Sequence, residues 1–363
     1  MGNQASKVIE KSREKKEKRK VRRRSTISVS AQSHGSLQIT PSSPTRANYD
    51  WLEAATPPPL SPSASMTNTR TSSSTNSTRR RSVSEFFTKR RQSLKMTNSQ
   101  DEYKENDRLQ RLHYLLKSAR KSNYWAPIQV EENFTILDLG CGGAIWSLEV
   151  AVQHPKAQVF AVDVKASQSL HYSPKNLQCK IFDITEPWQD IEDNSVDFIY
   201  QRNMGQQIKA DKWDFVVSEM YRTLKPGGYI EIFEPDLYHH NPGPVQQAFD
   251  SFLKTQCEES GIEFALSDAI PKAINDAGFT ELNTRLLDLP VGEWPSDPEL
   301  KQFGFINKEV QRALLKNMKS FYTSNWGISS EDFDLASQEV LEEFEEYHGF
   351  TRFSCWIAIK PTA

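Results

Sequence analysis

The segment from Phe134 to Asp163, FTILDLGCGGAIWSLEVAVQHPKAQVFAVD, constrains the fold of this chain more than any other segment. It begins with a short apolar run, which is followed by a cluster of three glycines. A stretch with helix-like spacing and a second apolar run, ending at Asp163, come next. This order predicts a strand, a tight turn, a helix that begins near Ala144, and a second strand. It is typical of the opening unit of a doubly wound α/β sheet.

The predicted turn has the features of a ligand site. Gly140, Gly142 and Gly143 permit backbone angles that other residues avoid, and they let a ligand approach the main chain. The helix that follows directs its unpaired N–H groups and the positive end of its dipole toward that ligand. Asp163, at the tip of the second strand, is placed to accept hydrogen bonds from a ribose diol. We therefore expect a cofactor that contains a nucleoside.

The details of the turn bear on which cofactor this is. The dinucleotide fingerprint G-x-G-x-x-G needs a glycine where this chain has Ile145. The larger residue argues against the close helix–strand packing of dinucleotide-binding enzymes. Asp138, two residues before the first glycine, is also unlike that fingerprint, and it suits a ligand with an ammonium group. S-adenosylmethionine carries such a group on its methionine half.

Charge divides the chain into two regions. Residues 1–100 hold 20 Lys and Arg against 6 Asp and Glu, a net charge of +14. Residues 101–363 hold 25 against 41, a net charge of −16, which would repel nucleic acid phosphate and makes a nucleic acid acceptor unfavourable. The four cysteines are widely separated without C-x-x-C spacing, which predicts neither a metal site nor a disulfide framework and fits a cytoplasmic protein.

The basic region begins with a pattern for lipid attachment. Met1–Ser6 fits M-G-x-x-x-[ST], which predicts N-myristoylation of Gly2 once Met1 is removed. One acyl chain binds a bilayer only marginally and needs a second signal. The polybasic run Lys11–Arg24 supplies one by attracting an anionic membrane surface. A second interpretation stays open, in which the basic run is a nuclear localisation or nucleic-acid signal.

The rest of the tail is rich in Ser, Thr and Pro, with few large apolar residues. Such a segment cannot bury enough surface to offset its ordering entropy, so we expect residues 1–100 to be disordered. Kinases are predicted partners, because three sites have the form Arg-Arg-x-Ser: Arg22–Ser25, Arg79–Ser82 and Arg90–Ser93. Phosphates there would remove positive charge and weaken binding to an anionic membrane.

Residues 101–363 continue the alternation of strands and helices. Helical spacing is present at 102–120, and further strands are predicted at 177–183, 195–201, 229–234, 280–287 and 350–359. A turn at Lys225–Gly228 precedes the strand at 229–234, and most of the segment between residues 241 and 348 is predicted to be helical. A helix at 331–347 is expected to expose its acidic residues. We expect a parallel sheet with its ligand site at the carboxyl edge.

Five motifs in this order carry a resemblance to a known family: ILDLGCGGAIWSLEVA (Ile136–Ala151), AVDV (Ala161–Val164), FDITEPW (Phe182–Trp188), NSVDFIYQR (Asn194–Arg202) and LKPGGYIEIFEPD (Leu224–Asp236). Over about residues 101–360 the chain resembles class I S-adenosylmethionine-dependent methyltransferases, and specifically the fungal LaeA-like (UMTA-type) group. The resemblance implies a Rossmann-like α/β fold with a mostly parallel seven-stranded sheet, an antiparallel last strand and helices on both faces. The methyltransferase domain would span residues 101–363, with its core at 130–240 and a helical insert on the acceptor side at about 241–348.

The resemblance also implies residues for the methionine half of the cofactor. Asp138 and the loop backbone would hold the methionine moiety, and Gln201 and Arg202 would lie beside the sulfonium. The loop residues are Gly140, Cys141, Gly142, Gly143 and Ala144. Ala144 departs from the general G-x-G-x-G pattern, and its methyl group is expected to crowd the loop only slightly.

For the nucleoside half, the resemblance implies that Asp163 takes the ribose hydroxyls and that Val164 lies against the adenine. Asp183 would accept a hydrogen bond from the adenine amino group, and Ile184 would cover the adenine face. Tyr103 and Tyr124 are candidates for a lid on the N-terminal side. Ordinary packing is the alternative for both tyrosines.

Methyl transfer from a sulfonium is an in-line displacement that needs proximity and, only for some acceptors, a base. His239 and His240 follow the predicted fifth strand and are the candidates for that base; simple exposure is the alternative. The predicted activity is methyl transfer to a small molecule or a protein. The alternative is a cofactor-binding regulator that acts through protein partners with little turnover.

Overall fold

The structure is a computed structural model that describes residues 99–165 and 173–362. The predictions for Gly2, the polybasic run and the kinase sites lie outside these residues. The described helices are α3 (Ser99–Arg120), α4 (Ile145–Gln153), α5 (Trp213–Thr223), α6 (Pro244–Ser260), α7 (Leu266–Asp276), α8 (Pro298–Trp326) and α9 (Ser330–Glu346). The described strands are β1 (Thr135–Leu139), β2 (Gln158–Asp163), β3 (Leu177–Ile181), β4 (Val196–Arg202), β5 (Leu224–Pro235), β6 (Thr280–Pro290) and β7 (Phe350–Ile359).

The seven strands form one sheet in the order β3-β2-β1-β4-β5-β7-β6. Strands β1 to β5 pair in parallel, and β7 is antiparallel to both of its neighbours, β5 and β6. This confirms the predicted fold class. The chain moves in one direction across the sheet from β1 to β3 and in the other direction from β4 onward. The resulting switch point between β1 and β4 is where open α/β sheets bind ligands, at the carboxyl ends of the strands.

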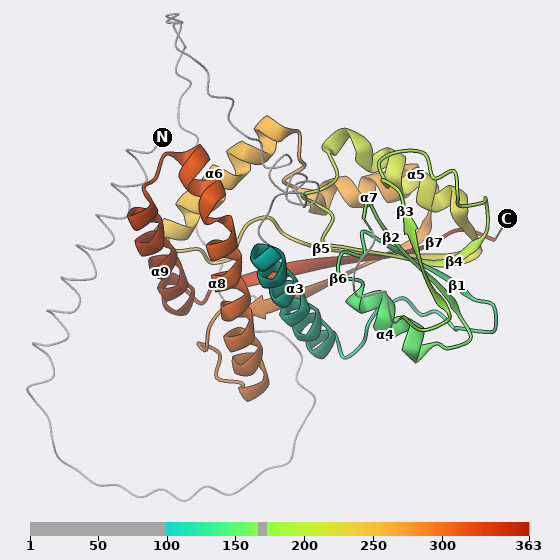
Figure 1. The fold of residues 1–363 in the computed structure, drawn as a ribbon, viewed down its shortest axis with the longest axis horizontal. Helices are drawn as coiled ribbons and strands as arrows, with labels where there is room; N and C mark the ends of the chain where they lie inside the picture. Colours follow the sequence, from blue (N-terminus) through green and yellow to red (C-terminus); the bar gives the residue numbers. More distant parts are fainter. Residues whose placement is uncertain (1–98, 166–172, 363) are drawn as a thin grey trace, which may run out of the picture. The chain divides into compact units, whose positions relative to one another are not determined.

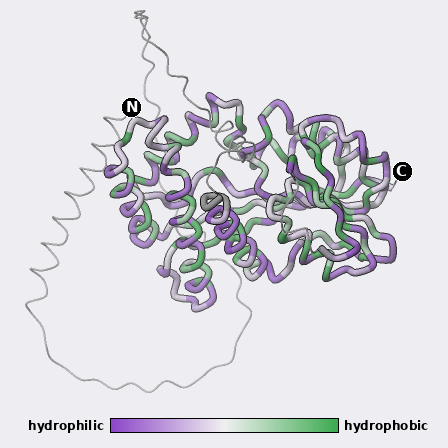
Figure 2. Tube along the Cα trace, in the orientation of Figure 1, coloured by the Kyte–Doolittle hydropathy of each residue, from purple (hydrophilic) through white to green (hydrophobic). Residues whose placement is uncertain are grey.

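Helices cover both faces of the sheet, as predicted (Figure 1). One hydrophobic cluster joins α5 and α7 to one face, and a second joins α3 and α4 to the other. The parallel strands are apolar on both faces for this reason, and β1 has four buried residues in succession. The hydropathy trace shows the same concentration of apolar residues along the strands (Figure 2).

Helices α6, α8 and α9 share a third hydrophobic cluster, in which aromatic rings such as Phe249, Tyr322 and Trp326 pack together. The region predicted as a helical insert at about 241–348 is therefore not one unit. Within it, α7 packs on α5 and β6 forms the edge of the sheet. No helix in the described part of the chain has the length and apolar content needed to cross a membrane.

Two local predictions need correction. The predicted turn Lys225–Gly228 lies inside β5 as a bulge, because Val196 pairs with Leu224 while Phe198 pairs with Tyr229. The acidic residues of α9 are not all exposed, since Glu343 is buried and accepts hydrogen bonds from the backbone N–H groups of Val245 and Gln246. These donors belong to the first turn of α6, which has no capping side chain of its own. A carboxylate therefore caps α6 from another helix.

Candidate functional site

The glycine loop, residues 140–144, connects β1 to α4 at the carboxyl edge of the sheet. It crosses toward the neighbouring strand β2, where the Cys141 N–H donates to the Val162 carbonyl over 2.9 Å. Gly140 and Gly142 have φ angles of 69° and 55°, in the left-handed region that residues with a side chain avoid. The tight turn predicted from these glycines is present for that reason.

Ala144 precedes the first residue of α4 and also has a left-handed backbone, with φ of 57°. A non-glycine residue in that region costs about 1 kcal/mol. The Ala144 side chain is buried in the cluster beneath α4. The departure from glycine therefore acts through backbone strain rather than through the crowding expected from the sequence.

The glycines of the loop differ in how much free space lies beside each of them. A Cβ at Gly140 would lie 2.2 Å from the Met204 sulfur, so a side chain there would collide with the turn after β4. A Cβ at Gly142 or Gly143 would have no neighbour within 4 Å. The main chain is therefore open to a ligand at Gly142 and Gly143, and it is packed against Met204 at Gly140.

Asp163 ends β2 beside this opening. Its side chain is buried, and its Oδ2 accepts a hydrogen bond from the Gly142 N–H over 2.9 Å. Val164, the next residue, is 36% exposed. The structure thus places Asp163 and Val164 next to the open part of the loop.

Asp138 lies on the other side of the loop, near the end of β1. Its carboxylate is buried and accepts a hydrogen bond from the Ser147 hydroxyl of α4. Burial raises the pKa of Asp138 to about 6, while the Ser147 hydrogen bond and the positive charge of Arg202 act in the opposite direction. An acidic group at this position would be stabilised in its ionised form by a cationic ligand.

The ends of β4 and β5 bring a second buried acid to the site. Glu234 is fully buried and accepts hydrogen bonds from the N–H groups of Met204 and Gly205, at 2.8 and 2.9 Å. Burial raises the pKa of Glu234 to about 7, against the effect of those two hydrogen bonds. Gln201, also fully buried, lies near enough to lower that pKa, yet neither of its amide atoms has a partner with hydrogen-bond geometry. A buried amide whose hydrogen-bonding groups are not all satisfied is a candidate contact for a polar ligand.

Arg202, the last residue of β4, contacts helix α3. One of its terminal nitrogens (Nη2) donates to Nδ1 of His113 over 3.2 Å. His113 is 1% exposed, and its Nε2 lies 3.0 Å from the Glu149 carboxylate of α4. His113, Glu234 and Met204 were not predicted as site residues. Because each contacts a predicted site residue only across the tertiary fold, no local motif marks them.

The predicted adenine contacts differ in their surroundings. Asp183 is exposed, and its Oδ1 accepts hydrogen bonds from the backbone N–H and the hydroxyl of Thr185. Ile184 is only 4% exposed and packs in the core cluster beneath α5 with Trp188. The structure therefore leaves Asp183 accessible, whereas Ile184 has little surface for covering an adenine ring.

The two lid candidates do not meet at the site. Tyr103 is 67% exposed on the first part of α3. Tyr124 hydrogen-bonds His154 over 2.8 Å and packs edge-on against Phe198. Because α4 runs from the carboxyl edge to the amino edge of the sheet, His154 beyond its end lies far from the glycine loop. Tyr124 is therefore a packing residue of the segment leading into β1 and not part of a lid.

The two candidate bases are both held by carboxylates rather than freely exposed. His239 has both ring nitrogens engaged, with Asp250 and Gln246 on Nδ1 and Gln311 on Nε2. His240 stacks on Phe350, and its Nε2 lies 2.8 Å from Asp236. Within the described chain, Nδ1 of His240 has no hydrogen-bond partner. Of the pair, only His240 retains a nitrogen that could accept a proton from a substrate.

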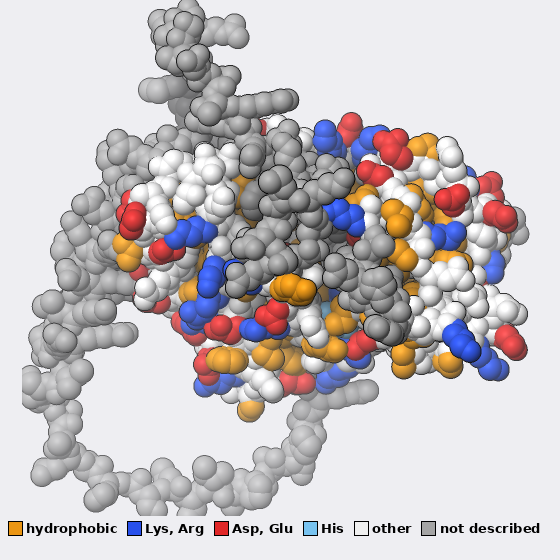
Figure 3. Space-filling model, in the orientation of Figure 1, with side chains coloured by type: hydrophobic (Ala, Val, Ile, Leu, Met, Phe, Trp, Pro, Cys, Tyr) orange, Lys and Arg blue, Asp and Glu red, His pale blue; other side chains and the backbone are white. Residues whose placement is uncertain are grey.

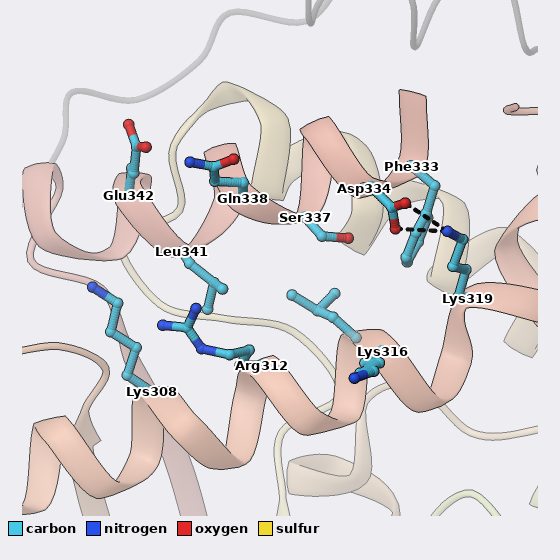
Figure 4. A pocket seen from close by; sticks show the side chains of 11 residues that line it. Lys308, Arg312, Lys316, Lys319, Phe333, Asp334, Ser337, Gln338, Leu341 and Glu342 are labelled. Carbon is cyan, nitrogen blue, oxygen red and sulfur yellow. Dashed lines mark hydrogen bonds and ion pairs between the residues drawn. The ribbon is translucent and has the colours of Figure 1, made fainter. Parts of the chain in front are cut away.

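A groove of about 670 Å³ lies between α8 and α9, away from the glycine loop (Figure 4). Its α8 wall carries four cations, Lys308, Arg312, Lys316 and Lys319, and basic side chains are visible over α8 in the space-filling view (Figure 3). Three of the four pair with carboxylates, of Glu345, Glu309 and Asp334. The groove therefore presents little unpaired charge to a ligand. Among residues 99–165 and 173–362, no cluster of His, Cys, Asp or Glu could hold a metal ion.

Comparison with known proteins identifies the family. Residues 136–228 match the family model described as a methyltransferase domain. The chain is 26% identical over 270 residues to the methyltransferase pytC of Aspergillus terreus, which covers 71% of this chain and 81% of that protein. It is 34% identical over 272 residues to laeA of Emericella nidulans, which covers 71% of this chain and 70% of that protein. That relative is described both as a protein-methionine methyltransferase and as a secondary metabolism regulator.

Among solved structures, the chain is similar to phosphoethanolamine N-methyltransferase 2 of Haemonchus contortus in complex with S-adenosyl-L-methionine. The TM-score is 0.44 at 19% identity, and the match covers 70% of this chain and 52% of that one. The 34% identity to laeA, over 71% of this chain, decides the family. The chain belongs to the LaeA-like group of class I S-adenosylmethionine-dependent methyltransferases.

Proposed function

We propose that this methyltransferase holds S-adenosylmethionine along the carboxyl edge of β1, β2 and β4 and methylates a small-molecule or protein acceptor. The observation that carries the proposal is the open main chain at Gly142 and Gly143, with Asp163 hydrogen-bonded to that same loop. A ligand with a ribose diol and an amino acid moiety needs such a combination of exposed N–H groups and flanking carboxylates.

The residues present fit this cofactor. Asp163 would take the ribose hydroxyls in place of the Gly142 N–H, and Asp138 would hold the ammonium group. The buried amide of Gln201, which no partner satisfies with good hydrogen-bond geometry, is a further sign of fit, since a polar ligand at the end of β4 would satisfy it. When bound, the cofactor supplies a methyl group on an already activated, positively charged sulfur.

The chain's own contribution would then be binding and orientation. The loop and the two aspartates would fix the cofactor, and Met204 against Gly140 would fix the position of the turn after β4. For an acceptor that must lose a proton, His240 would be the base, oriented by Asp236. Replacing His240 with Asn should then abolish the acid limb of the pH–rate profile, whereas His239→Asn should leave it.

Isothermal titration with S-adenosylmethionine tests the site. Asp163→Ala should weaken binding at least 10-fold, because the ribose hydroxyls lose a charge-assisted acceptor worth about 1.5–3 kcal/mol. Asp190→Ala, an exposed acid in the loop after β3, is the matched control and should bind like the wild type. Equal affinity of Asp163→Ala and the wild type would contradict the proposed placement.

A regulatory role with little turnover is the second candidate. It is supported by the relative laeA, which is described as a secondary metabolism regulator as well as a methyltransferase. Incubation with labelled methyl donor and cell extract separates the two roles. Formation of S-adenosylhomocysteine together with a labelled product supports catalysis, and the chemical class of that product identifies the acceptor. Cofactor binding without turnover supports the regulator.

We propose in addition that the N-terminal tail recruits this protein from the cytoplasm to anionic membranes through acylated Gly2 and the basic run Lys11–Arg24. Replacing Gly2 with Ala should move the protein from the membrane fraction to the soluble fraction. An unchanged membrane fraction would contradict acylation, and nuclear accumulation of the wild type would support the alternative interpretation of the basic run. Phosphorylation of the Arg-Arg-x-Ser sites should reduce membrane binding.

A further inference from the structure

Three charged or polar side chains from three different elements form a chain of contacts that ends at the candidate site. Glu149 of α4 contacts Nε2 of His113 of α3 over 3.0 Å, and Nδ1 of His113 contacts Arg202 of β4 over 3.2 Å. Lys117, one turn after His113, also binds Glu149, over 2.8 Å. The connection is long-range in sequence, since His113 and Arg202 are 89 residues apart.

The hydrogen-bond network allows only one tautomer of His113. A guanidinium can only donate, so the nitrogen facing Arg202 must be the unprotonated acceptor. The other nitrogen then carries the proton and donates it to the Glu149 carboxylate. Burial, together with the positive charge of Arg202, lowers the pKa of His113 to about 4, so the ring is neutral at physiological pH. The imidazole is therefore held in one orientation from both sides.

Arg202 has donors left over for a ligand. Its guanidinium has five N–H groups, and in the described part of the chain His113 is its one hydrogen-bond partner. Its positive charge acts on both buried acids of the site and lowers the pKa values of Asp138 and Glu234. The family resemblance implies a place for Arg202 beside the sulfonium, but this cation would repel a sulfonium. The group of the cofactor that suits Arg202 is the carboxylate at the methionine end.

We propose that His113 is a positioning residue that fixes the Arg202 fork so that its remaining donors hold the cofactor carboxylate. This rests on the proposed function, because it takes the methionine half of the cofactor to lie at the end of β4. The role requires an acceptor at the Nδ1 position, since a side chain without one there would leave Arg202 free to rotate. Helix α3 is then part of the cofactor site and not only a cover for the sheet.

Two substitutions separate positioning from packing. In His113→Asn, the amide oxygen stands near the position of Nδ1 and can accept from Arg202. In His113→Gln, the longer side chain instead reaches the position of Nε2 and can only replace the contact to Glu149. The dissociation constant for S-adenosylmethionine is measured by titration for both variants, alone and combined with Arg202→Met, and thermal melting is followed in parallel. Lys117→Met serves as a control that changes the partner of Glu149 but not that of Arg202.

The expected result is an asymmetry in affinity without a matching asymmetry in stability. His113→Asn and Lys117→Met should bind within about threefold of the wild type, and His113→Gln should bind at least tenfold more weakly. In the Arg202→Met background the two His113 variants should bind equally. Equal losses for Asn and Gln, or a difference that persists without Arg202, would overturn the inference. If the His113 variants do not fold, Arg202→Lys, which keeps the charge but loses the fork, must still weaken binding tenfold.

The same titrations distinguish this inference from the function on which it rests. A wild type that binds no S-adenosylmethionine overturns the proposed site, and the role of His113 with it. A wild type that binds, and that loses affinity in Asp163→Ala but shows no coupling between His113 and Arg202, overturns only the role of His113.

Discussion

Two glutamates on β5, Glu231 and Glu234, are equally buried but are satisfied in different ways. Glu231 forms an ion pair with Arg120 and accepts hydrogen bonds from the Trp125 and Ala126 N–H groups, at 2.6 and 2.7 Å. Within the described chain, Glu234 forms no ion pair; it accepts hydrogen bonds from the backbone of the turn after β4 and lies beside the Gln201 amide. The pKa of Glu234 is raised to about 7 by its burial.

Strand geometry explains the difference. Side chains three positions apart on a strand point to opposite faces of the sheet. Glu231 faces the side covered by α3, and there it holds the segment that leads from α3 into β1. Glu234 faces the side covered by α7 and lies near the glycine loop, where it accepts hydrogen bonds from the turn after β4. A buried acid thus holds the scaffold on one face, and on the other, beside the candidate site, its raised pKa keeps part of its population protonated near pH 7.

The largest expected effect tests the scaffold acid. Replacing Arg120 with Met should destabilise the protein by about 3–5 kcal/mol, because it leaves the Glu231 charge buried without its partner. The free energy of unfolding is measured by urea denaturation with tryptophan fluorescence. The double variant Arg120→Met/Glu231→Gln should recover part of the loss, since it removes both charges. A double variant less stable than Arg120→Met alone would show that the pair is not the source of the effect.

A smaller effect tests the acid near the site. In the folded protein Glu234 retains a proton at pH values where the unfolded chain, with an ordinary glutamate pKa of 4.5, has lost it. Its contribution to folding therefore becomes less favourable as pH rises from about 4.5 to 7. Glu234→Gln cannot ionise, so its stability relative to the wild type should improve by about 3 kcal/mol over that range. Urea denaturation at several pH values measures this, with Asp190→Asn as the control; a constant difference would contradict the raised pKa.

The smallest expected effect tests an exposed ion pair on α3, the helix that also carries Arg120. Arg111 and Asp107 are paired over 2.8 Å, but both side chains are more than half exposed to solvent. Asp107→Asn should change the free energy of unfolding by less than about 0.5 kcal/mol, because solvent screens the pair. A loss comparable to that of Arg120→Met would mean that burial does not decide the strength of these pairs.

Spacing and residue type were sufficient to predict much of the fold and the position of the glycine loop. The apolar runs around Gly140 and Asp163 predicted β1, α4 and β2, and the prediction of β7 at Phe350–Ile359 matches the observed strand. These features are local, because a strand, a glycine turn and a helix start are encoded within about thirty residues. The same local logic failed at Tyr124, whose position depends on how the segment after α3 crosses the sheet.

The sequence by itself determined the glycine loop, the two aspartates beside it and the family to which they belong. Only the tertiary structure decided which side chains support them. The docking of α3 brings Arg120 to Glu231 and His113 to Arg202, across 111 and 89 residues. The strain at Ala144 likewise shows only in its backbone angle. Contacts between distant segments depend on the packing of whole elements, and residue spacing within one segment carries no information about that packing.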